Sequence, residues 1–251
     1  MERTSPLQIL AEAFRDVHRN PGPLFLYLAI TVGMSIGLAV LQYVVKRLGI
    51  EESLPAVSQS IGFVRDIVLA LGDAVAASIA FSRLGRELDK PLWKIEGDWE
   101  ALRRFFLPWF ILSLGFVAVI QLLRAAVGSD AASGAVVAAD VGVIVLAACI
   151  VPLGACIMFH GRLDWREIPE SLSPLAKQFP LALVFFLLGF VVFGLLGDIH
   201  VLLARSLDVR NSAVAPVIEV LDGYFECVIF AGIWEICRIS RDMIEEHDIE
   251  F

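Results

Sequence analysis

The sequence is poor in charged residues. Only 19% of its 251 residues are Asp, Glu, Lys or Arg and 58% are hydrophobic, whereas ordinary soluble domains are about 25% charged and roughly 45 to 50% apolar. The hydrophobic residues form long runs without any charge, the longest from Gly22 to Val45, which is long enough to cross a bilayer as a helix. This scarcity of charge excludes a soluble globular domain.

An excess of positive charge is also absent, since the formal net charge is −8. Surfaces that bind nucleic acid neutralise its phosphates with clustered Lys and Arg. No run of these residues is long enough to form such a patch. We therefore exclude nucleic acid as a partner.

Motifs of the common enzyme and metal sites are missing as well. The sequence holds no H-E-x-x-H, G-x-S-x-G, P-loop or G-x-G-x-x-G motif. Its four histidines are far apart, and its four cysteines lie inside apolar runs without a C-x-x-C pair, so we expect buried free thiols. The cysteines are Cys149, Cys156, Cys227 and Cys237. We expect no enzyme activity, no cofactor and no metal site.

Six apolar runs are long enough to span a membrane. Helices are the expected form, because open strands would leave backbone polar groups unsatisfied in lipid. The sequence thus predicts an all-α, polytopic transmembrane bundle. The expected spans are Pro23–Val45, Ile61–Ser82, Phe105–Leu123, Ala135–Phe159, Phe179–Ala204 and Ala213–Cys237.

The basic residues between the spans predict the orientation. Of the 20 Lys and Arg residues, 14 lie in the segments on one side of the predicted membrane. These segments are 1–22, 83–104, 160–178 and 238–251. Because loops rich in Lys and Arg stay in the cytoplasm, we expect both termini there. The first apolar run is too long for a cleaved signal peptide, so we expect it to remain as an anchor.

The segment before the first span has the pattern of an amphipathic helix. Ser5 and Pro6 suit an N-cap and a first helical position, and Asn20-Pro21-Gly22 suits a helix end. The apolar stripe is expected to hold Leu7, Leu10, Phe14 and Val17. Such a helix lies on the cytoplasmic leaflet, or docks on the bundle or on a partner. The chain then divides into this helix (1–22), a six-span domain (23–237) and a cytoplasmic C-terminal tail (238–251).

The spacing of prolines and basic clusters indicates an internal repeat. Arg86, Arg162 and Arg241 end the even-numbered spans and recur after about 75 to 80 residues. This period predicts three helical hairpins, at 23–82, 105–159 and 179–237. Part of the pattern also follows from the positive-inside rule without any duplication.

Ionisable residues are distributed unevenly among the spans. The first and third spans have none, whereas Asp73 and Glu226 lie near the middle of the second and sixth. An ionised carboxylate there costs at least about 2.5 to 3.5 kcal/mol, so such groups face the protein interior. We expect the even-numbered spans to form the centre and the first, third and most of the fifth to face lipid. We also expect a proton on Asp73 or Glu226 at neutral pH.

A wider set of carboxylates could form a polar site inside the bilayer. The candidates are Asp66, Asp73, Asp140, Glu219, Asp222 and Glu226. Several lie toward the outer side, near Asp198 and a group of arginines. The arginines are Arg65, Arg124, Arg205 and Arg210. These groups form either ion pairs that fix how hairpins pack, or a functional pocket or proton path.

The basic segment between the second and third spans is the expected docking surface. Tryptophans are interspersed among its charges. The candidates are Arg83, Arg86, Trp93, Trp99, Arg103 and Arg104. Anchoring of the tryptophans at the membrane interface is an equally good interpretation.

A resemblance to a known family can be stated from the opening residues. The segment Pro6 to Asn20 (PLQILAEAFRDVHRN), followed closely by Pro23 to Leu28 (PLFLYL), resembles the start of the YciC-like and glycerophosphodiester phosphodiesterase membrane-domain proteins of bacteria. The resemblance implies an amphipathic helix followed by several spans, in a bacterial inner membrane. It carries over no site residues, and the phosphodiesterase catalytic domain of some members has no counterpart here.

Two functions follow from these features. The first expectation is a non-catalytic accessory or scaffold protein in the inner membrane, which binds lipids and other membrane proteins or itself. The alternative is a transporter for a proton, a cation or a small solute. In that case the path would run through the even-numbered spans, with Asp73 and Glu226 as its central residues.

Overall fold

The computed structural model describes residues 5–47, 55–88, 95, 97–127, 133–161, 168–206 and 214–249. Within these ranges the chain is helical apart from caps and short turns, and it contains no strand, which confirms the predicted all-α fold. The helices are α1 (Pro6–Arg19), α2 (Pro21–Arg47), α4 (Pro55–Leu88), α5 (Asp98–Val127), α6 (Ser133–His160), α7 (Ile168–Ser171), α8 (Ser173–Lys177), α9 (Phe179–Ser206) and α10 (Val214–Ile249).

Five of these helices are long and apolar enough to cross a membrane. Their apolar segments are Pro21–Leu41, Phe63–Leu88, Asp98–Leu123, Val136–His160 and Phe179–Ile199. The prediction of a multi-pass helical membrane protein is confirmed at this level. The sixth predicted span, in α10, is not among the five, and α10 carries Glu219, Asp222 and Glu226 within its first half. It also continues as a helix to Ile249, where a tail was expected from residue 238.

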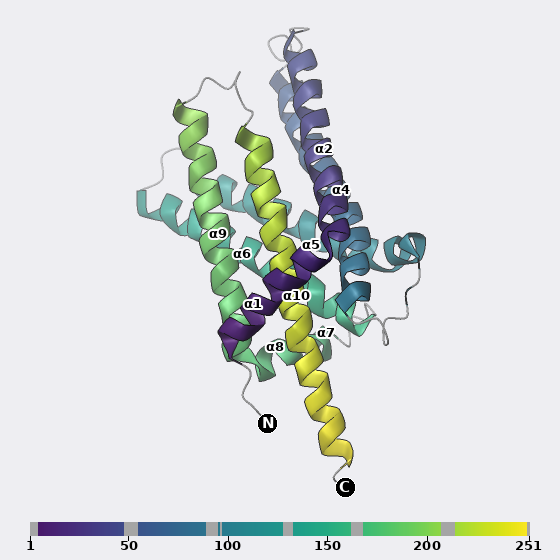
Figure 1. The fold of residues 1–251 in the computed structure, drawn as a ribbon. Coiled ribbons are helices and arrows are strands. Elements are labelled where there is room, and N and C mark those ends of the chain that lie inside the picture. Colours follow the sequence, from purple (N-terminus) through teal and green to yellow (C-terminus); the bar gives the residue numbers. More distant parts are fainter. Residues whose placement is uncertain are drawn as a thin grey trace.

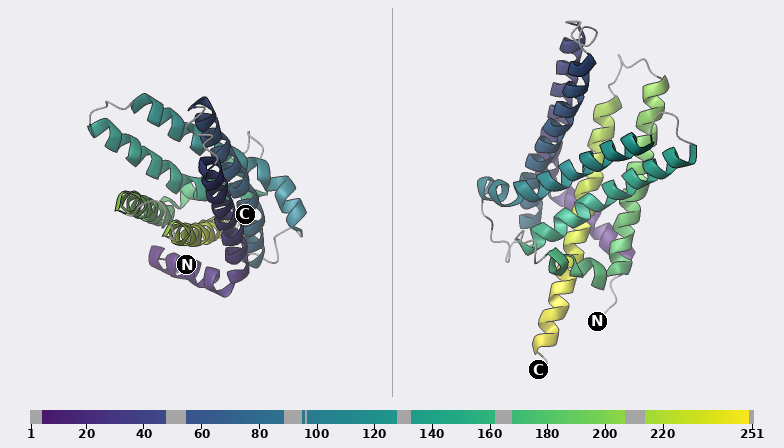
Figure 2. Two further views of the ribbon diagram at one scale, coloured as in Figure 1. Left: turned by 90° about the horizontal axis from the view of Figure 1, so that it is seen from above. Right: turned by 180° about the vertical axis from the view of Figure 1, so that it is seen from behind.

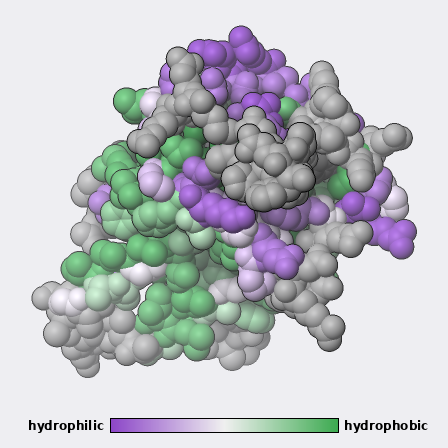
Figure 3. All heavy atoms as spheres, turned by 90° about the horizontal axis from the view of Figure 1, so that it is seen from below, coloured by the Kyte–Doolittle hydropathy of each residue, from purple (hydrophilic) through white to green (hydrophobic). Residues whose placement is uncertain are grey.

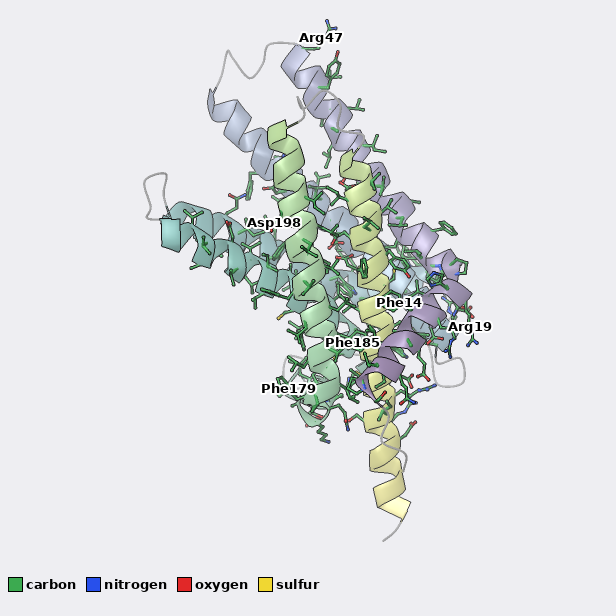
Figure 4. All side chains as sticks on the ribbon, turned by 60° about the vertical axis from the view of Figure 1, so that its left-hand side comes forward. Phe14, Arg19, Arg47, Phe179, Phe185 and Asp198 are labelled. Atoms are coloured by element: carbon green, nitrogen blue, oxygen red, sulfur yellow. The ribbon has the colours of Figure 1, made fainter. Side chains whose placement is uncertain are left out.

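The long helices converge at one end and separate at the other. In Figure 1, α2, α4, α9 and α10 run up the page, while α5 and α6 cross behind them at a steep angle. Each helix of the pairs α2 and α4, α5 and α6, and α9 and α10 packs against the other, and α4 also packs along α5. Figure 2 shows from above and from behind that the three pairs point apart at their far ends. We call the end where α2 ends and α10 begins the upper end; Figure 4 labels Arg47 there and Phe179 at the lower end.

The buried core lies in the lower half of the molecule. It includes the segment of α10 from Cys227 to Cys237, together with the lower parts of α4 and α6. In α4, 56% of the most apolar stretch is buried, and in α6 44%, against 6% in α2 and 17% in both α5 and α9. The expectation that the even-numbered runs form the centre is therefore confirmed.

Large rings packed on glycines give the core its close helix contacts. A Cβ atom on Gly154 of α6 would lie 2.2 Å from the Trp109 ring, and one on Gly85 of α4 would lie 2.9 Å from the Trp234 ring. Small residues let membrane helices approach closely, because lipid offers no hydrophobic force to drive them together. The α5–α6 and α4–α10 contacts therefore depend on these glycines.

Helix α1 is docked on the bundle, one of the three positions considered for it. Ser5 caps it: the Gln8 N–H donates to Ser5 Oγ (3.2 Å) and the Ser5 N–H donates to Gln8 Oε1 (2.8 Å), which satisfies two free N–H groups of the first turn. The helix crosses α10 and reaches α9 (Figure 1), and it ends at Arg19, just before the break that was predicted to end it.

The buried face of α1 matches the predicted stripe in part, since Val17 is buried and Leu10 and Phe14 pack half-buried against the core. Ile9, Ala13 and Val17 are buried, and Phe14 lies where α1 crosses α10 (Figure 4). Leu7, which was expected on the stripe, is 75% exposed. The stripe is therefore rotated toward Ile9, because the residues that meet α10 decide which face is buried.

Partial burial of α1 also raises the pKa of the Asp16 carboxyl above its ordinary value.

The four cysteines are free thiols, as expected. Three are buried and Cys149 is half-buried. The Sγ atoms of Cys156 in α6 and Cys237 in α10 are 3.6 Å apart, a contact that the sequence pattern did not predict.

Candidate functional site

Four helices bring polar side chains together in the interior. Tyr27 of α2 reaches both Asp73 of α4 and Glu226 of α10: its hydroxyl oxygen is 2.9 Å from Asp73 Oδ1 and in hydrogen-bond contact with Glu226 Oε2. Ser113 of α5 donates to Asp73 Oδ2 (2.5 Å). We call Asp73 and Glu226 the carboxyl pair. The two carboxylates singled out by the sequence as central are thus joined through one phenol.

Small residues on the neighbouring helices let Tyr27 enter this position. The ring is only 3% exposed, and a Cβ atom on Gly223 of α10 would lie 3.1 Å from its Cδ1 and Cε1 atoms. Gly223 precedes Glu226 by about one helical turn. Because Gly223 has no side chain, α2 approaches α10 closely enough for the phenol to pass between α4 and α10.

The two contacts of the Tyr27 hydroxyl with Asp73 and Glu226 indicate how many protons these three groups carry. A phenol carries one hydrogen, so it donates to one acceptor at a time. Two ionised carboxylates would leave one of the two Tyr27 contacts without a hydrogen between its oxygens. Both contacts are hydrogen bonds only when Asp73 or Glu226 is protonated and donates to the phenol oxygen. The geometry therefore favours the expected shared proton.

Further carboxylates continue from the carboxyl pair toward the upper end. Asp222 lies about one turn above Glu226 on α10, and Glu219 lies about one turn farther. Both keep part of their surface exposed. Asp66, about 10 Å above Asp73 along α4, accepts from Gln121 Nε2 of α5 (3.0 Å) and pairs with its neighbour Arg65 (3.0 Å). Asp66 thus belongs to a separate polar group.

Below the carboxyl pair, stacked rings close the interior. Phe81 stacks on Tyr27 with ring centres 5.1 Å apart, and on Phe230 with centres 4.5 Å apart; the Trp109 ring lies 5.3 Å from Phe81. All are buried. We call Phe81, Trp109 and Phe230 the aromatic layer. The carboxyl pair lies above this layer and is half-buried.

Not every predicted carboxylate joins this site. Asp140 of α6 and Asp198 of α9 are exposed, so the structure does not bring Asp140 to the carboxyl pair. Its helix turns that position outward, because Ala148 and the residues below it make the contact with the core. Of the expected arginine group, only the Arg65 side chain is described, and its partner is Asp66. The side chains of Arg124, Arg205 and Arg210 lie outside the described part.

The predicted docking segment is partly structural. Arg83 binds Asp98 with Nε and Nη2, which ties the end of α4 to the start of α5, and Arg86 lies 4.0 Å from the same carboxylate. Arg104 is exposed, lies 3.4 Å from Glu100 and donates to the Gly161 carbonyl. Two residues remain as exposed docking candidates, Trp99 (78% exposed) and Arg103. Trp93 lies outside the described residues.

Sequence reasoning missed Tyr27 and Ser113. Both belong to spans without ionisable residues, which were expected to face lipid. A hydroxyl group inside an apolar run was the available signal, because a buried hydroxyl needs a hydrogen-bond partner. Both side chains are buried beside the carboxyl pair, and the hydroxyl group of each forms a hydrogen bond with Asp73.

Comparisons with known proteins found no match. No family model matches the chain, and neither a curated protein nor a solved structure matches it. The resemblance to the YciC-like family therefore stays a prediction. Among the described residues, no group of three or more His, Cys, Asp or Glu side chains is placed to hold a metal ion.

Proposed function

We propose that the chain is a proton-binding membrane transporter and that the carboxyl pair is its proton site. The observation that carries this proposal is the Tyr27 hydroxyl placed between Asp73 and Glu226. It supports the second of the two functions expected from the sequence. A transporter of this kind needs no enzyme activity and no cofactor.

The physical basis is the cost of charge in a membrane interior. A single proton shared by two carboxyls leaves one negative charge in place of two, and a second proton makes the pair neutral. Either change alters how firmly Tyr27 and Ser113 hold α2 and α5 to the centre. A proton that arrives from the upper end, past Glu219 and Asp222, would thus loosen or tighten the contact between helices.

The aromatic layer supplies the second part of the cycle. With Phe81, Trp109 and Phe230 packed together, the carboxyl pair is closed toward the lower end. Release of the proton on that side requires these rings to separate. Alternating access of this kind moves helix pairs against each other around a fixed site.

The proposal includes a topology. We propose α10 as the sixth span, because Glu226, the carboxylate nearest its middle, meets Tyr27 of α2 and not lipid. The spans then form three hairpins, α2 with α4, α5 with α6 and α9 with α10. By the positive-inside rule, the basic lower segments support a cytoplasmic position for both termini in a bacterial inner membrane, with lipid around the exposed apolar faces of α2 and α9.

Proton flux in liposomes tests the proposed function. We expect liposomes with the wild-type protein to take up protons when a potassium diffusion potential drives them, as reported by an enclosed pH-sensitive dye. Asp73→Asn and Glu226→Gln should reduce the flux to that of empty liposomes, because each removes one proton-binding group of the pair. Asp140→Asn is the matched control, since this exposed carboxylate takes no part in the site.

Two results would count against the proposal. The first is wild-type flux no greater than that of empty liposomes. The second is unchanged flux in Asp73→Asn and Glu226→Gln proteins that elute from a size-exclusion column as the wild type does.

The accessory or scaffold function is a second candidate because of the exposed surface at the start of α5. Trp99 is 78% exposed there and Arg103 is exposed beside it, and exposed Trp and Arg are common at binding surfaces. Gentle extraction from the native membrane separates the candidates. A stoichiometric protein partner that is lost in Trp99→Ala and kept in Glu226→Gln would favour the scaffold.

A further inference from the structure

The lower end of α4 carries two polar side chains that face inward. Ser82 and Arg86 are four residues apart, so they lie on the same face of the helix. Ser82 is fully buried, and a third of the Arg86 side chain is exposed. Gly85, between them, lies against the Trp234 ring of α10. Seen from below, hydrophilic residues gather on this end of the molecule beside a hydrophobic flank (Figure 3).

Several hydrogen-bond donors at this place are buried without a partner. In the part of the chain that the structure describes, they are Ser82 Oγ, Arg86 Nε and Arg86 Nη2. Ser78, one turn earlier, shows the ordinary arrangement, because its hydroxyl donates to the Ala74 carbonyl (2.5 Å). Buried polar groups nearly always have a partner, and a buried charged donor without one is costly. These donors therefore call for a ligand.

The nearest carboxylate does not fill this need. Asp98 lies 4.0 Å from Arg86 Nη2 through Oδ1, which is beyond hydrogen-bond range. Both oxygens of Asp98 already accept from Arg83, through the Nε and Nη2 atoms of that guanidinium. Arg86 leaves the same two atoms unpaired. This edge of a guanidinium is a planar fork that fits two oxygens of a carboxylate or phosphate at once.

We propose that Ser82 and Arg86 form a binding site for a phosphate group. The Arg86 fork would bind two phosphate oxygens, and the Ser82 hydroxyl would donate to one of them. This inference is independent of the proton-binding function, because it uses other residues of α4, about two and a half turns (Ser82) and three and a half turns (Arg86) below Asp73.

A second cation lies on the facing helix. The Arg241 guanidinium of α10 stacks 5.3 Å above the centre of the Phe159 ring, and Phe159 packs edge-on against Trp234 (5.0 Å). Since Trp234 is the ring that rests on Gly85, Arg241 lies on the same side of the core as Arg86. Arg241 also pairs with Asp242 (3.5 Å), so its charge is partly balanced and the proposed site depends on Ser82 and Arg86.

Two sources could supply the phosphate, an anionic phospholipid headgroup or free phosphate. The site lies near the end of the apolar segment of α4, which closes at Leu88. Headgroups lie at this depth when such a segment spans the bilayer. The shared chemistry is a phosphate with at least two free oxygens.

Thermal unfolding in phospholipid-free detergent tests the site. We expect short-chain phosphatidylglycerol, inorganic phosphate or both to raise the Tm of the wild type in a saturable way. The apparent affinity should fall at least about tenfold in Arg86→Gln, which is the loss that corresponds to a charged hydrogen bond. Arg103→Gln is the matched control, because Arg103 is exposed.

A second variant keeps the test decisive if Arg86→Gln does not fold. Without ligand, Ser82→Ala should have a Tm equal to or above that of the wild type, because it removes a buried unpaired hydroxyl. With ligand, it should gain less stability. Stabilisation by the lipid alone assigns the site to headgroups, and stabilisation by both assigns it to phosphate in general. Two results overturn the proposal. In the first, no ligand raises the Tm of the wild type. In the second, the ligand raises the Tm of the Arg86→Gln and Ser82→Ala variants as much as that of the wild type.

Discussion

Replacing Gly232 by alanine is expected to lower the stability of the protein clearly. A Cβ atom at this position of α10 would lie 2.0 Å from both Cε1 and Cζ of Phe185 in α9, and the Phe185 ring is fully buried. Phe185 lies between the two helices (Figure 4), so the ring has no free space to move into. Overpacking of this kind costs about 1 to 3 kcal/mol, and we expect Tm to fall by several degrees.

The control for this variant is Gly197→Ala in α9, where no atom lies within 4 Å of the added carbon. Alanine is a better helix former than glycine by about 1 kcal/mol, so this change should leave Tm unchanged or raise it. The double variant Gly232→Ala with Phe185→Leu should recover part of the loss, because the smaller side chain frees the space. Equal Tm values for Gly232→Ala and Gly197→Ala would show that α9 and α10 do not pack through this contact.

Tags at the two ends of the chain are expected on the same side of the membrane. Six spans return the chain to the side where it began, whereas five spans would leave the ends on opposite sides. The question therefore depends on α10, which has the carboxylates of the proposed site in its upper half. A helix can cross with such residues if they face the protein interior, as Glu226 does through its contact with Tyr27.

Protease protection of tags in inverted membrane vesicles measures this topology. We expect tags after Met1 and after Phe251 to be cleaved from the outside of inverted vesicles, since both ends would face the former cytoplasm. A single cysteine at the upper end of α2, such as Arg47→Cys, lies beyond the apolar segment that ends at Leu41 and is exposed, so it should react with a membrane-impermeant reagent only from the opposite side. Cleavage of one tag alone would show that α10 does not cross.

The five helices that are long and apolar enough to cross a membrane could be predicted from the sequence, because lipid imposes a local rule. Each residue of a span meets the cost of leaving water, so a run of apolar residues is sufficient evidence of a span. The predicted span from Phe179 to Ala204 and the observed apolar segment from Phe179 to Ile199 begin at the same residue. The central position of α4 and α6 followed from the same cost, applied to ionisable residues.

The proposed sixth span shows the limit of this local rule, because its apolar run was predicted as a span and yet α10 is not among the five helices apolar enough to cross. The carboxylates of α10 lower the hydropathy of its apolar segment, because a rule based on composition treats each carboxylate as if it faced lipid. In the structure Glu226 instead meets Tyr27, and the helix from Cys227 to Cys237 is enclosed. Burial inside the bundle is a property of several helices together, which a single run of residues does not record.

The contacts that make the site depend on the three-dimensional packing and not on sequence patterns. Tyr27 and Ser113 lie far from Asp73 and Glu226 in the chain, and no spacing rule links them. The ring contacts of Gly154 and Gly232 are equally distant in sequence. The sequence therefore predicts that Asp73 and Glu226 lie inside the bundle, and the packing decides which hydroxyl groups form hydrogen bonds with them.

The protonation of the carboxyl pair is the central claim, and infrared spectroscopy tests it most directly. At neutral pH we expect the C=O stretching band of a protonated carboxyl group in the wild type, lost or shifted in both Asp73→Asn and Glu226→Gln and kept in Asp140→Asn. A protonated carboxyl band that appears only near about pH 4, the ordinary range of Asp and Glu, would show that both members are ionised and would contradict the account.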